Sequence, residues 1–385
     1  MPPAPSPADT GLYIHVPFCR RRCAYCDFYA LPLDPEPAGD PVARYLAALD
    51  REAGRFAPPG FRPATVYLGG GTPTALPPGA LDRLLAIAHA RFDLSGVAEW
   101  TCEVNPGTVS RDTAARLRAA GVNRAAIGVQ SFDPARLRLL GRIHGPGAIP
   151  RTFSTLRDAG IENLAADLIH GVPGQGLAGF AADLDALLAL APDHVSVYAL
   201  DVPDGTPMAD AVRAGRLAAP DDDEAADQYA HARDILRGAG FVHDELSSFA
   251  RPGRSGRHNR LYWTGGDVLG IGPAAHSVLG RTRRGNPRNL DAWAAALARE
   301  EAPWAFEETL APEAWAREAL ILALRRIEGV DAEAFRRRTG YAPEALRPAE
   351  TARLFAAGQL VRTPRGFRLA DDALFVSNAV FRELV

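Results

Sequence analysis

The sequence lacks any hydrophobic run long enough to span a membrane. Apolar runs such as Leu184–Leu190 are far shorter than a bilayer crossing and are broken by charged residues. An excess of one charge is also lacking: the net charge of the 385 residues is only −3, so no overall field directs the chain toward nucleic acid or anionic lipid. With 47% apolar residues and no tandem repeat, the composition predicts a globular protein of more than one domain without a transmembrane segment.

An export signal is lacking as well. The N-terminal sequence MPPAPSPADTG has neither a basic start nor an apolar core, and it predicts a flexible leader over residues 1–11 of a cytoplasmic protein. There are only four cysteines, and in a reducing compartment they are not expected to form disulfides. Three of them, Cys19, Cys23 and Cys26, fall within eight residues, which requires another explanation.

The first half of the chain alternates between short β-rich runs and amphipathic stretches. Strand and helix patterns at this spacing are typical of βαβ units, so they predict an α/β fold with a parallel sheet. The expected strands are Leu12–Val16, Thr65–Gly69, Glu99–Val104, Arg124–Gln130, Asn163–His170 and His194–Val202. The expected helices are Val42–Phe56, Leu81–Phe92, Arg111–Ala120, Ile149–Ala159 and Phe180–Leu190, and Gly121 is the expected end of the third.

The second half has a different pattern. A Pro-, Gly- and Asp-rich segment, Pro203–Pro220, precedes an expected helix over Asp222–Ala239 and an extended piece over Phe241–Phe249. From Ala311, three helical patterns are followed by two β-runs about a Thr-Pro-Arg-Gly turn, an order that resembles a winged-helix module. The expected units after the leader are therefore an α/β unit over 12–202, an α+β extension over 203–310 and the C-terminal module over 311–385.

Each expected strand of the first half carries polar or glycine residues near its C-terminal end. The sequences there are HVPFC, GGGTPT, EVNP, GVQS, DLIHG and YALD. Ligands of parallel α/β sheets gather at the carboxyl edge of the strands. These scattered residues are therefore expected to form one site.

Three interpretations compete for the C-x3-C-x2-C spacing. Structural zinc sites usually have four ligands in paired C-x2-C units, and here the fourth would have to be Cys102, His15 or a distant residue. A redox pair of Cys23 and Cys26 would leave Cys19 without a role. Three thiolates on one loop fit a 4Fe–4S cluster bound through three of its irons, the interpretation we favour. Cys102 lies within an expected strand and is predicted to be a small buried hydrophobe.

The open fourth iron of such a cluster can bind the amino and carboxylate groups of S-adenosylmethionine (SAM), and this cysteine spacing is the signature of radical-SAM proteins. The sequence YLGGGTPT ends an expected strand with three glycines, which would let the backbone approach SAM and offer it N–H groups. Glu103 is a candidate acceptor for the ammonium group or ribose of SAM. Further polar candidates are Gln130, Arg142 and Asp167.

Seven motifs occur in a specific order: LYIHVPFCRRRCAYCDFY, YLGGGTPT, EVNPGT, GVQSFD, DLIHGVPGQ, HNRLYW and GIGPAAHS. Together they resemble the radical-SAM oxygen-independent coproporphyrinogen III oxidase family, and most closely its heme-chaperone branch (HemW-type). The resemblance implies a partial (β/α)6 barrel of TIM-like, radical-SAM type that binds a 4Fe–4S cluster and SAM. It implies that SAM is contacted by Tyr13, Gly70, Thr72 and Glu103. The oxidases have further positions that contact a second SAM molecule. The resemblance implies that the corresponding residues here are Gly71, Tyr25, Gln130, Arg142 and Asp167.

Phe28 separates this chain from the true oxidases. Those carry a further cysteine two residues after the third, at the position of Phe28, and a longer segment before the motif. Both departures are the pattern of the chaperone branch, so the resemblance implies a protein that binds heme and passes it to acceptors such as respiratory enzymes. The alternative is the oxidase itself, which decarboxylates porphyrinogen propionates through a radical, and Phe28 argues against that enzyme activity.

Heme requires an axial ligand such as imidazole, apolar surface, and cations for its propionates. His258 in RHNRLYW is the first candidate ligand and His276 in PAAHS is the second. The RHNRLYW segment also offers cations and apolar surface in Arg257, Arg260, Tyr262 and Trp263. The alternative is that His258 and Asn259 hydrogen-bond a loop while Tyr262 and Trp263 pack on the barrel. The C-terminal module has no evident basic stripe with base-reading side chains, so no nucleic-acid partner is expected, and any membrane contact would come through the acceptor.

Overall fold

The structure is a computed structural model that describes residues 10–33 and 40–385. Residues 1–9 of the expected leader lie outside the described residues, whereas Thr10 and Gly11 already belong to strand β1 (Thr10–Val16). In the described part of the chain, no helix is both long enough and apolar enough to cross a bilayer.

Six parallel strands form the centre of the fold, as the alternating pattern predicts. They lie next to one another in chain order as β1, β4 (Thr65–Gly70), β5 (Glu99–Val104), β6 (Arg124–Gln130), β7 (Asn163–His170) and β8 (His194–Ala199). Most of their residues are buried on both faces, which is the usual state of parallel strands covered by helices. The predicted limits of β5, β6 and β7 agree with the structure.

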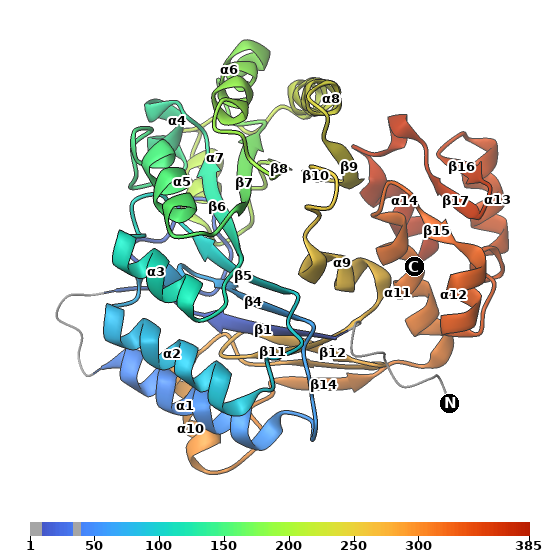
Figure 1. Cartoon of the computed structure of the whole chain (residues 1–385). Coiled ribbons are helices and arrows are strands. Elements are labelled where there is room, and N and C mark those ends of the chain that lie inside the picture. Colours follow the sequence, from blue (N-terminus) through green and yellow to red (C-terminus); the bar gives the residue numbers. More distant parts are fainter. Residues whose placement is uncertain (1–9, 34–39) are drawn as a thin grey trace.

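Six helices connect these strands and cover the outer face of the curved sheet (Figure 1). They are α1 (Pro41–Phe56), α2 (Pro78–Arg91), α3 (Arg111–Ala119), α4 (Pro134–Leu139), α5 (Ala148–Asp158) and α6 (Gly176–Leu188). Of these, α4 was not expected. Gly121 follows α3 with φ 105°, a left-handed conformation that favours glycine, and the amide of Val122 donates to the carbonyl of Leu117, so the predicted helix end is confirmed.

The segment 203–310 lengthens the same sheet at both edges. Beside β1 lie β11 (Asp267–Ile271, parallel to β1), β12 (His276–Leu279), β13 (Thr282–Gly285) and β14 (Phe306–Thr309); beside β8 lie β10 (Ser248–Ala250) and β9 (Val242–Glu245). The helices of this segment are α7 (Pro207–Arg213), α8 (Asp222–Gly238), α9 (Arg257–Thr264) and α10 (Leu290–Ala298). A short parallel pair near the cysteines consists of β2 (Phe18–Cys19) and β3 (Leu31–Pro32).

Helix α9 lies on the inner face of the sheet, at the N-terminal ends of the barrel strands. Its first turn is held by Glu99, whose carboxylate accepts hydrogen bonds of 2.9 Å from the backbone amides of both Arg257 and His258. Gly265 ends the helix with a left-handed φ of 71°. No helix was expected over the RHNRLYW segment, so α9, which closes one end of the barrel, was not predicted.

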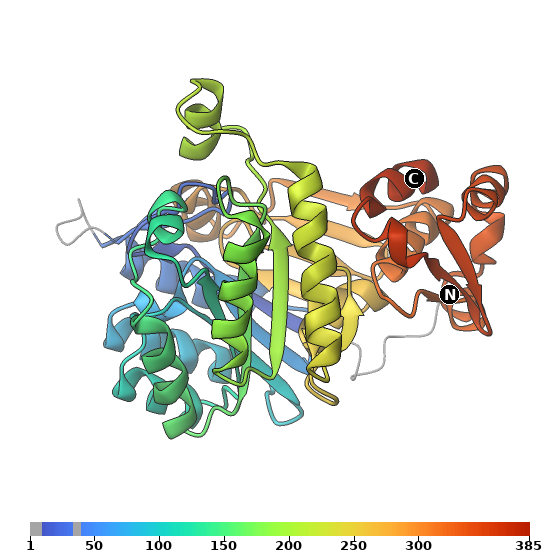
Figure 2. The ribbon, with the colours of Figure 1, turned by 90° about the horizontal axis from the view of Figure 1, so that it is seen from above.

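The C-terminal module lies to one side of the sheet (Figure 2). It contains α11 (Pro312–Leu324), α12 (Ala332–Thr339), α13 (Pro348–Ala356) and the hairpin β16 (Leu360–Thr363) and β17 (Gly366–Leu369). These elements are the three helices and two β-runs that were predicted. A short strand β15 (Val330–Asp331) on β17 and a last helix α14 (Ser377–Leu384) were not expected. The winged-helix classification stays a prediction.

Candidate functional site

The three motif cysteines lie on the segment between β1 and β3, with Cys19 at the end of β2, at the carboxyl edge of the sheet, and all three are half-buried. The loop is fixed by backbone hydrogen bonds. Ala24 donates to the carbonyl of Leu140 at 3.0 Å and accepts from the amide of Met208 at 2.9 Å. At the base of the loop, Leu31 donates to the carbonyl of Pro17 at 2.7 Å. The protein therefore positions the loop from several sides.

A series of polar side chains joins two of these cysteines. Cys19 Sγ lies 3.4 Å from the hydroxyl of Thr72, which accepts a hydrogen bond of 2.6 Å from the side-chain amide of Asn105. The amide oxygen of Asn105 accepts a hydrogen bond from Arg142, and Arg142 donates to Cys23 Sγ at 3.4 Å. Thr72 and Arg142, both predicted site residues, are thus brought together around the thiols by Asn105, which the sequence reasoning missed.

The electrostatics of the loop suit ligands that ionise only when iron binds. Burial raises the pKa of the Cys19 thiol to about 11, although the Thr72 hydroxyl opposes the shift. Burial also raises the pKa of Cys26. Both thiols are therefore protonated at neutral pH in the protein alone, and iron has to displace their protons. The Arg142 guanidinium supplies a positive charge beside them.

The glycine segment at the end of β4 packs closely against the cysteine loop. A Cβ at Gly71 would lie 2.5 Å from the carbonyl oxygen of Phe18, and a Cβ at Gly70 would lie 2.3 Å from the His15 ring, so neither position admits a side chain. The amides of Gly70, Gly71 and Thr72 donate to Glu103, Val16 and Phe18, respectively. The expectation that these N–H groups are free for SAM is therefore corrected: Gly71 lets backbone approach backbone, and Gly70 lies against the side chains of His15 and Glu103.

Two carboxylates project into the interior of the barrel. Glu103 accepts hydrogen bonds from the Tyr67 hydroxyl at 2.9 Å and from the Gly70 amide at 3.1 Å. Burial, with a smaller contribution from the nearby charge of Asp167, raises the pKa of Glu103 to about 7. Burial likewise raises the pKa of Asp167 to about 6, against the opposing effect of Ser196. A cationic ligand would favour the ionised form of both groups, so this interior is suited to the ammonium or sulfonium of SAM.

Both predicted tyrosines belong to the same interior. The Tyr13 hydroxyl lies 3.1 Å from His15 Nδ1, and the ring centroids of Tyr13 and Tyr67 are 6.0 Å apart. Burial raises the pKa of Tyr25, and the neighbouring Arg142 opposes the shift. Both tyrosines are therefore un-ionised hydrogen-bonding groups at neutral pH.

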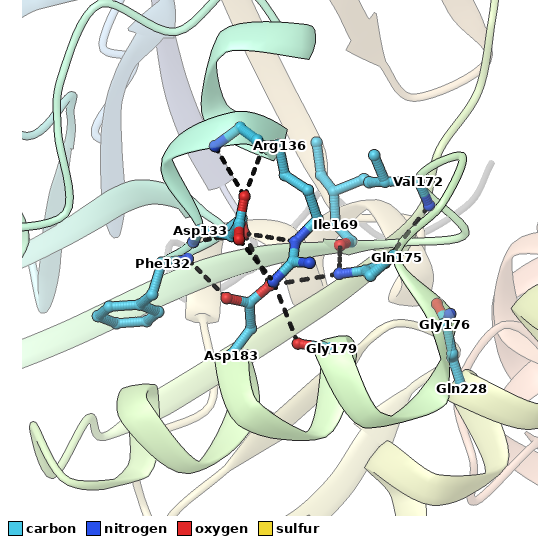
Figure 3. Close-up of polar contacts among 12 residues, drawn as sticks. Phe132, Asp133, Arg136, Ile169, Val172, Gln175, Gly176, Gly179, Asp183 and Gln228 are labelled. Atoms are coloured by element: carbon cyan, nitrogen blue, oxygen red, sulfur yellow. Dashed lines mark hydrogen bonds and ion pairs between the residues drawn. The ribbon is translucent and has the colours of Figure 1, made fainter. Parts of the chain in front are cut away.

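Gln130 ends β6 with an unusual backbone and an unsatisfied side chain. Its φ is 68°, in the left-handed region that residues with a side chain rarely adopt, and its buried Oε1 has no hydrogen-bond partner among the described residues. The following turn is held from behind by Asp183, which accepts hydrogen bonds of 2.7 Å from the Ser131 hydroxyl and the Phe132 amide and lies 3.3 Å from Arg136 (Figure 3). An unpaired buried amide oxygen is expected to face a ligand.

A site for a single metal ion is the alternative to a cluster. Across residues 10–33 and 40–385, no three His, Cys, Asp or Glu side chains converge closely enough to hold one ion. A cube spaces its three thiolates more widely, because each binds a different iron. Cys102 is fully buried in β5, as predicted, and is not a fourth member of the group.

The sequence places the chain among known proteins. Residues 13–187 match the Radical SAM superfamily. The chain is 38% identical over 371 residues to the heme chaperone HemW of Mycobacterium tuberculosis, a match that covers 96% of this chain and 95% of that protein. It is 31% identical to the heme chaperone HemW of Bacillus subtilis over 96% of this chain and 97% of that protein. The chain belongs to the HemW family.

A solved structure supports the fold predicted from the motifs. The radical-SAM coproporphyrinogen III oxidase HemN of Escherichia coli superposes with a TM-score of 0.85 over 97% of this chain and 89% of that chain, at 23% identity. The superfamily implies a 4Fe–4S cluster and SAM. When bound, such a cluster would supply an electron for the reduction of the SAM sulfonium. The residues of this chain hold the loop, supply the positive charge of Arg142 and offer Glu103 and Gln130 as acceptors.

His258, the first candidate for heme ligation, lies at the opposite end of the barrel from the cysteines. Its side chain is buried, 1% exposed, and its Nδ1 lies 2.8 Å from the Thr65 hydroxyl, while Nε2 lies 3.5 Å from the Tyr262 hydroxyl. An axial ligand needs a free nitrogen and an open side for the porphyrin, and His258 has neither in this structure. The alternative interpretation, in which His258 is held by hydrogen bonds and Tyr262 packs beside it, describes what is observed.

Arg260 and Trp263 of the RHNRLYW segment lie beside the C-terminal module. Arg260 pairs with Asp244 at 3.3 Å and with Glu328 at 2.8 Å, and it lines a cavity of about 580 Å³ beside the β16–β17 turn. Trp263 lies under the guanidinium of Arg325, 4.5 Å from its ring centroid. Neither residue comes near the cysteine loop, so the segment does not contribute to the site at the carboxyl edge.

Proposed function

We propose that this protein is a heme chaperone that binds heme and passes it to acceptor proteins, with a 4Fe–4S cluster and SAM as its resident cofactors. The observation that carries the proposal is the similarity, 38% over 96% of the chain, to a protein named heme chaperone HemW. Phe28 adds support, because this side chain, 67% exposed, stands where the oxidases carry a cysteine. Respiratory enzymes are the acceptor class that we propose.

Within this function we assign a role to each predicted site residue. The proposed cluster ligands are Cys19, Cys23 and Cys26. The proposed SAM contacts are Tyr13, Gly70, Thr72 and Glu103, and the further cofactor-binding residues are Gly71, Tyr25, Gln130, Arg142 and Asp167. The ionised Glu103 would bind the ammonium group of SAM. The unpaired Gln130 oxygen and the three half-buried cysteines support this arrangement.

Oxygen-independent coproporphyrinogen III oxidase is the alternative function. It is favoured by the fold shared with HemN, whose 23% identity is evidence of fold alone. Phe28 disfavours it. The two functions differ in their product, since the oxidase releases protoporphyrinogen and a chaperone releases unchanged heme.

The deciding experiment uses the full chain, reconstituted anaerobically with iron and sulfide. Heme is titrated by absorbance, and the loaded protein is then mixed with apomyoglobin as a probe acceptor. We expect a saturable Soret band and transfer of heme to the acceptor. The proposal is overturned if no heme binds, or if coproporphyrinogen III with SAM and a reductant yields protoporphyrinogen.

A further inference from the structure

The Gln130 side chain lies among the polar groups that join the motif cysteines. A Cβ placed on Gly128 would lie 3.0 Å from Gln130 Nε2, 3.0 Å from Asn105 Oδ1 and 3.1 Å from Arg142 Nη2. These three groups therefore share the space that a side chain at Gly128 would fill. Because Arg142 also donates to Cys23 Sγ at 3.4 Å, the Gln130 amide belongs to the surroundings of the proposed cluster.

Gln130 reaches this position through a strained turn. The amide of Ser131 donates to the carbonyl of Val129 at 2.9 Å, and with its φ of 68° Gln130 is the centre of a three-residue turn of the rare, strained kind. The pairing of β6 with β7 also shifts between Gly128 and Gln130. A backbone conformation of this kind persists only where its surroundings hold it, so a contact beyond the strand has to fix the turn.

Asp183 on α6 supplies that contact, because its buried carboxylate has four partners (Figure 3). They are the Ser131 hydroxyl at 2.7 Å, the Phe132 amide at 2.7 Å, the Arg136 guanidinium at 3.3 Å and the Gln175 side-chain amide at 3.3 Å. The first three belong to the segment directly after the turn, and Gln175 belongs to the loop after β7. A carboxylate with four partners has little capacity left for a ligand, so any effect of Asp183 on the site passes through the turn.

We propose that Asp183 is a positioning residue for SAM binding: it holds the strained turn so that the unpaired Gln130 Oε1 accepts a hydrogen bond from a hydroxyl or amino group of SAM. Asp183 itself does not touch the cofactor. This inference rests on the proposed function, in which SAM is a resident cofactor. It adds to that function a residue on an outer helix for which the sequence predicted no role.

The test measures the affinity of the full chain, reconstituted anaerobically with iron and sulfide, for SAM by equilibrium dialysis. Asp183→Asn replaces one accepting oxygen by an amide group that cannot accept, so the turn loses part of its support and SAM should bind about tenfold more weakly. The matched control is Asp193→Asn. Asp193 accepts a hydrogen bond of 3.0 Å from the Leu164 amide at the N-terminal end of the barrel, and its replacement should leave the affinity for SAM unchanged.

A double substitution separates positioning from a general loss of structure. Gln130→Ala should weaken SAM binding, and Asp183→Asn should cause no further loss in that background, because the turn then holds no acceptor. The electron paramagnetic resonance signal of the reduced cluster without SAM should be the same in the wild type, both single variants and the double variant. The inference is overturned if the two losses add in full, or if Asp193→Asn weakens SAM binding as much as Asp183→Asn does.

Ser131→Ala tests the same contact if Asp183→Asn does not fold. It removes one hydroxyl donor to Asp183 and should weaken SAM binding about two- to tenfold, again only while Gln130 is present. Wild-type affinity for SAM in either folded variant overturns the inference. Failure of the wild type to bind SAM would instead remove the cofactor from the proposed function, and the inference with it, whereas the heme titration tests the chaperone role separately.

Discussion

The two ends of the barrel use similar residues in opposite ways. At the N-terminal end, Glu99, Arg124 and His258 are all buried, and Glu99 has partners on α9 as well as the guanidinium of Arg124 4.0 Å away. At the carboxyl end, the thiols are half-buried and Gln130 keeps an unpaired oxygen. A histidine or carboxylate therefore indicates a ligand site only where its bonding capacity is left open; where partners already surround it, the same residue type stabilises the fold.

The largest effect is expected at the carboxyl end. Replacing Cys19, Cys23 or Cys26 by alanine should abolish the visible absorption of the reconstituted cluster, because each thiolate is proposed to bind a different iron. The matched control is Cys102→Ala, which should keep the cluster and lose roughly 1 kcal/mol of stability for the small cavity it creates. A cluster that survives in all three single variants, or disappears with Cys102, would contradict the assignment.

At the N-terminal end of the barrel, which α9 closes, a substitution of Glu99 should affect stability alone. Glu99→Ala leaves a buried guanidinium and two amides of α9 without their acceptor, so the free energy of unfolding should fall by about 3–5 kcal/mol. Urea unfolding measures this loss, and cluster content per folded molecule should stay constant. Glu300→Ala, which breaks an exposed pair with Arg55, should cost less than about 0.5 kcal/mol. Equal losses of unfolding free energy in Glu99→Ala and Glu300→Ala would contradict the difference that we expect between a buried and an exposed carboxylate.

Two asparagines, one at each end of the barrel, provide a further comparison of the two ends. Asn105→Ala removes the link between Thr72 and Arg142 and should lower the affinity for SAM, measured by equilibrium dialysis, about 10–100-fold. Asn123→Ala removes the acceptor of the Trp100 amide at the start of β5, a hydrogen bond of 2.9 Å, and should cost about 1 kcal/mol of stability with SAM binding unchanged. If Asn105→Ala binds SAM with wild-type affinity, the hydrogen bonds among Thr72, Asn105 and Arg142 stabilise the fold and do not support SAM binding.

The smallest effect concerns pH. Burial lowers the pKa of His258 to about 3, whereas in the unfolded chain its pKa is near 6.5. Below pH 6.5 the unfolded chain therefore binds a proton that the folded protein does not, so stability falls as pH falls toward 3. In His258→Gln, the slope of unfolding free energy against pH near pH 5 should be shallower by up to about 1.4 kcal/mol per unit. His276→Gln, at the carboxyl end of the barrel, should change this slope less. Identical slopes in the wild type and in His258→Gln would contradict the burial of the His258 side chain.

The strands of the barrel could be predicted closely because their pattern is local. β5, β6 and β7 are short apolar runs between clear helix signals, and their observed limits are the predicted ones. Helix α9 could not be predicted in this way, because its first turn depends on Glu99, a residue about 160 positions away whose carboxylate accepts its amides. The burial of His258 follows from the same distant contact.

The candidate site likewise contains residues that the local sequence predicts and residues whose role depends on distant contacts. Thr72 and Glu103 come from motifs that end strands, whereas Arg142 follows helix α4, and the structure brings all three to one edge. Asn105, in EVNP, also directly follows a strand. This position could have identified it as a candidate site residue from the sequence. Its importance appears only from two distances, to Thr72 and to Arg142, that depend on the packing of three strands.

The position of β1 at the centre of the sheet bears on how the protein is made. One neighbour of β1 is β4, but the other is β11, which ends only at Ile271. Until the ribosome has delivered that residue, the strand leading into the cysteine loop has one unpaired edge, where hydrogen-bonding groups are open to wrong partners. Iron insertion during translation would therefore meet a half-built loop, and maturation is expected to follow the release of most of the chain.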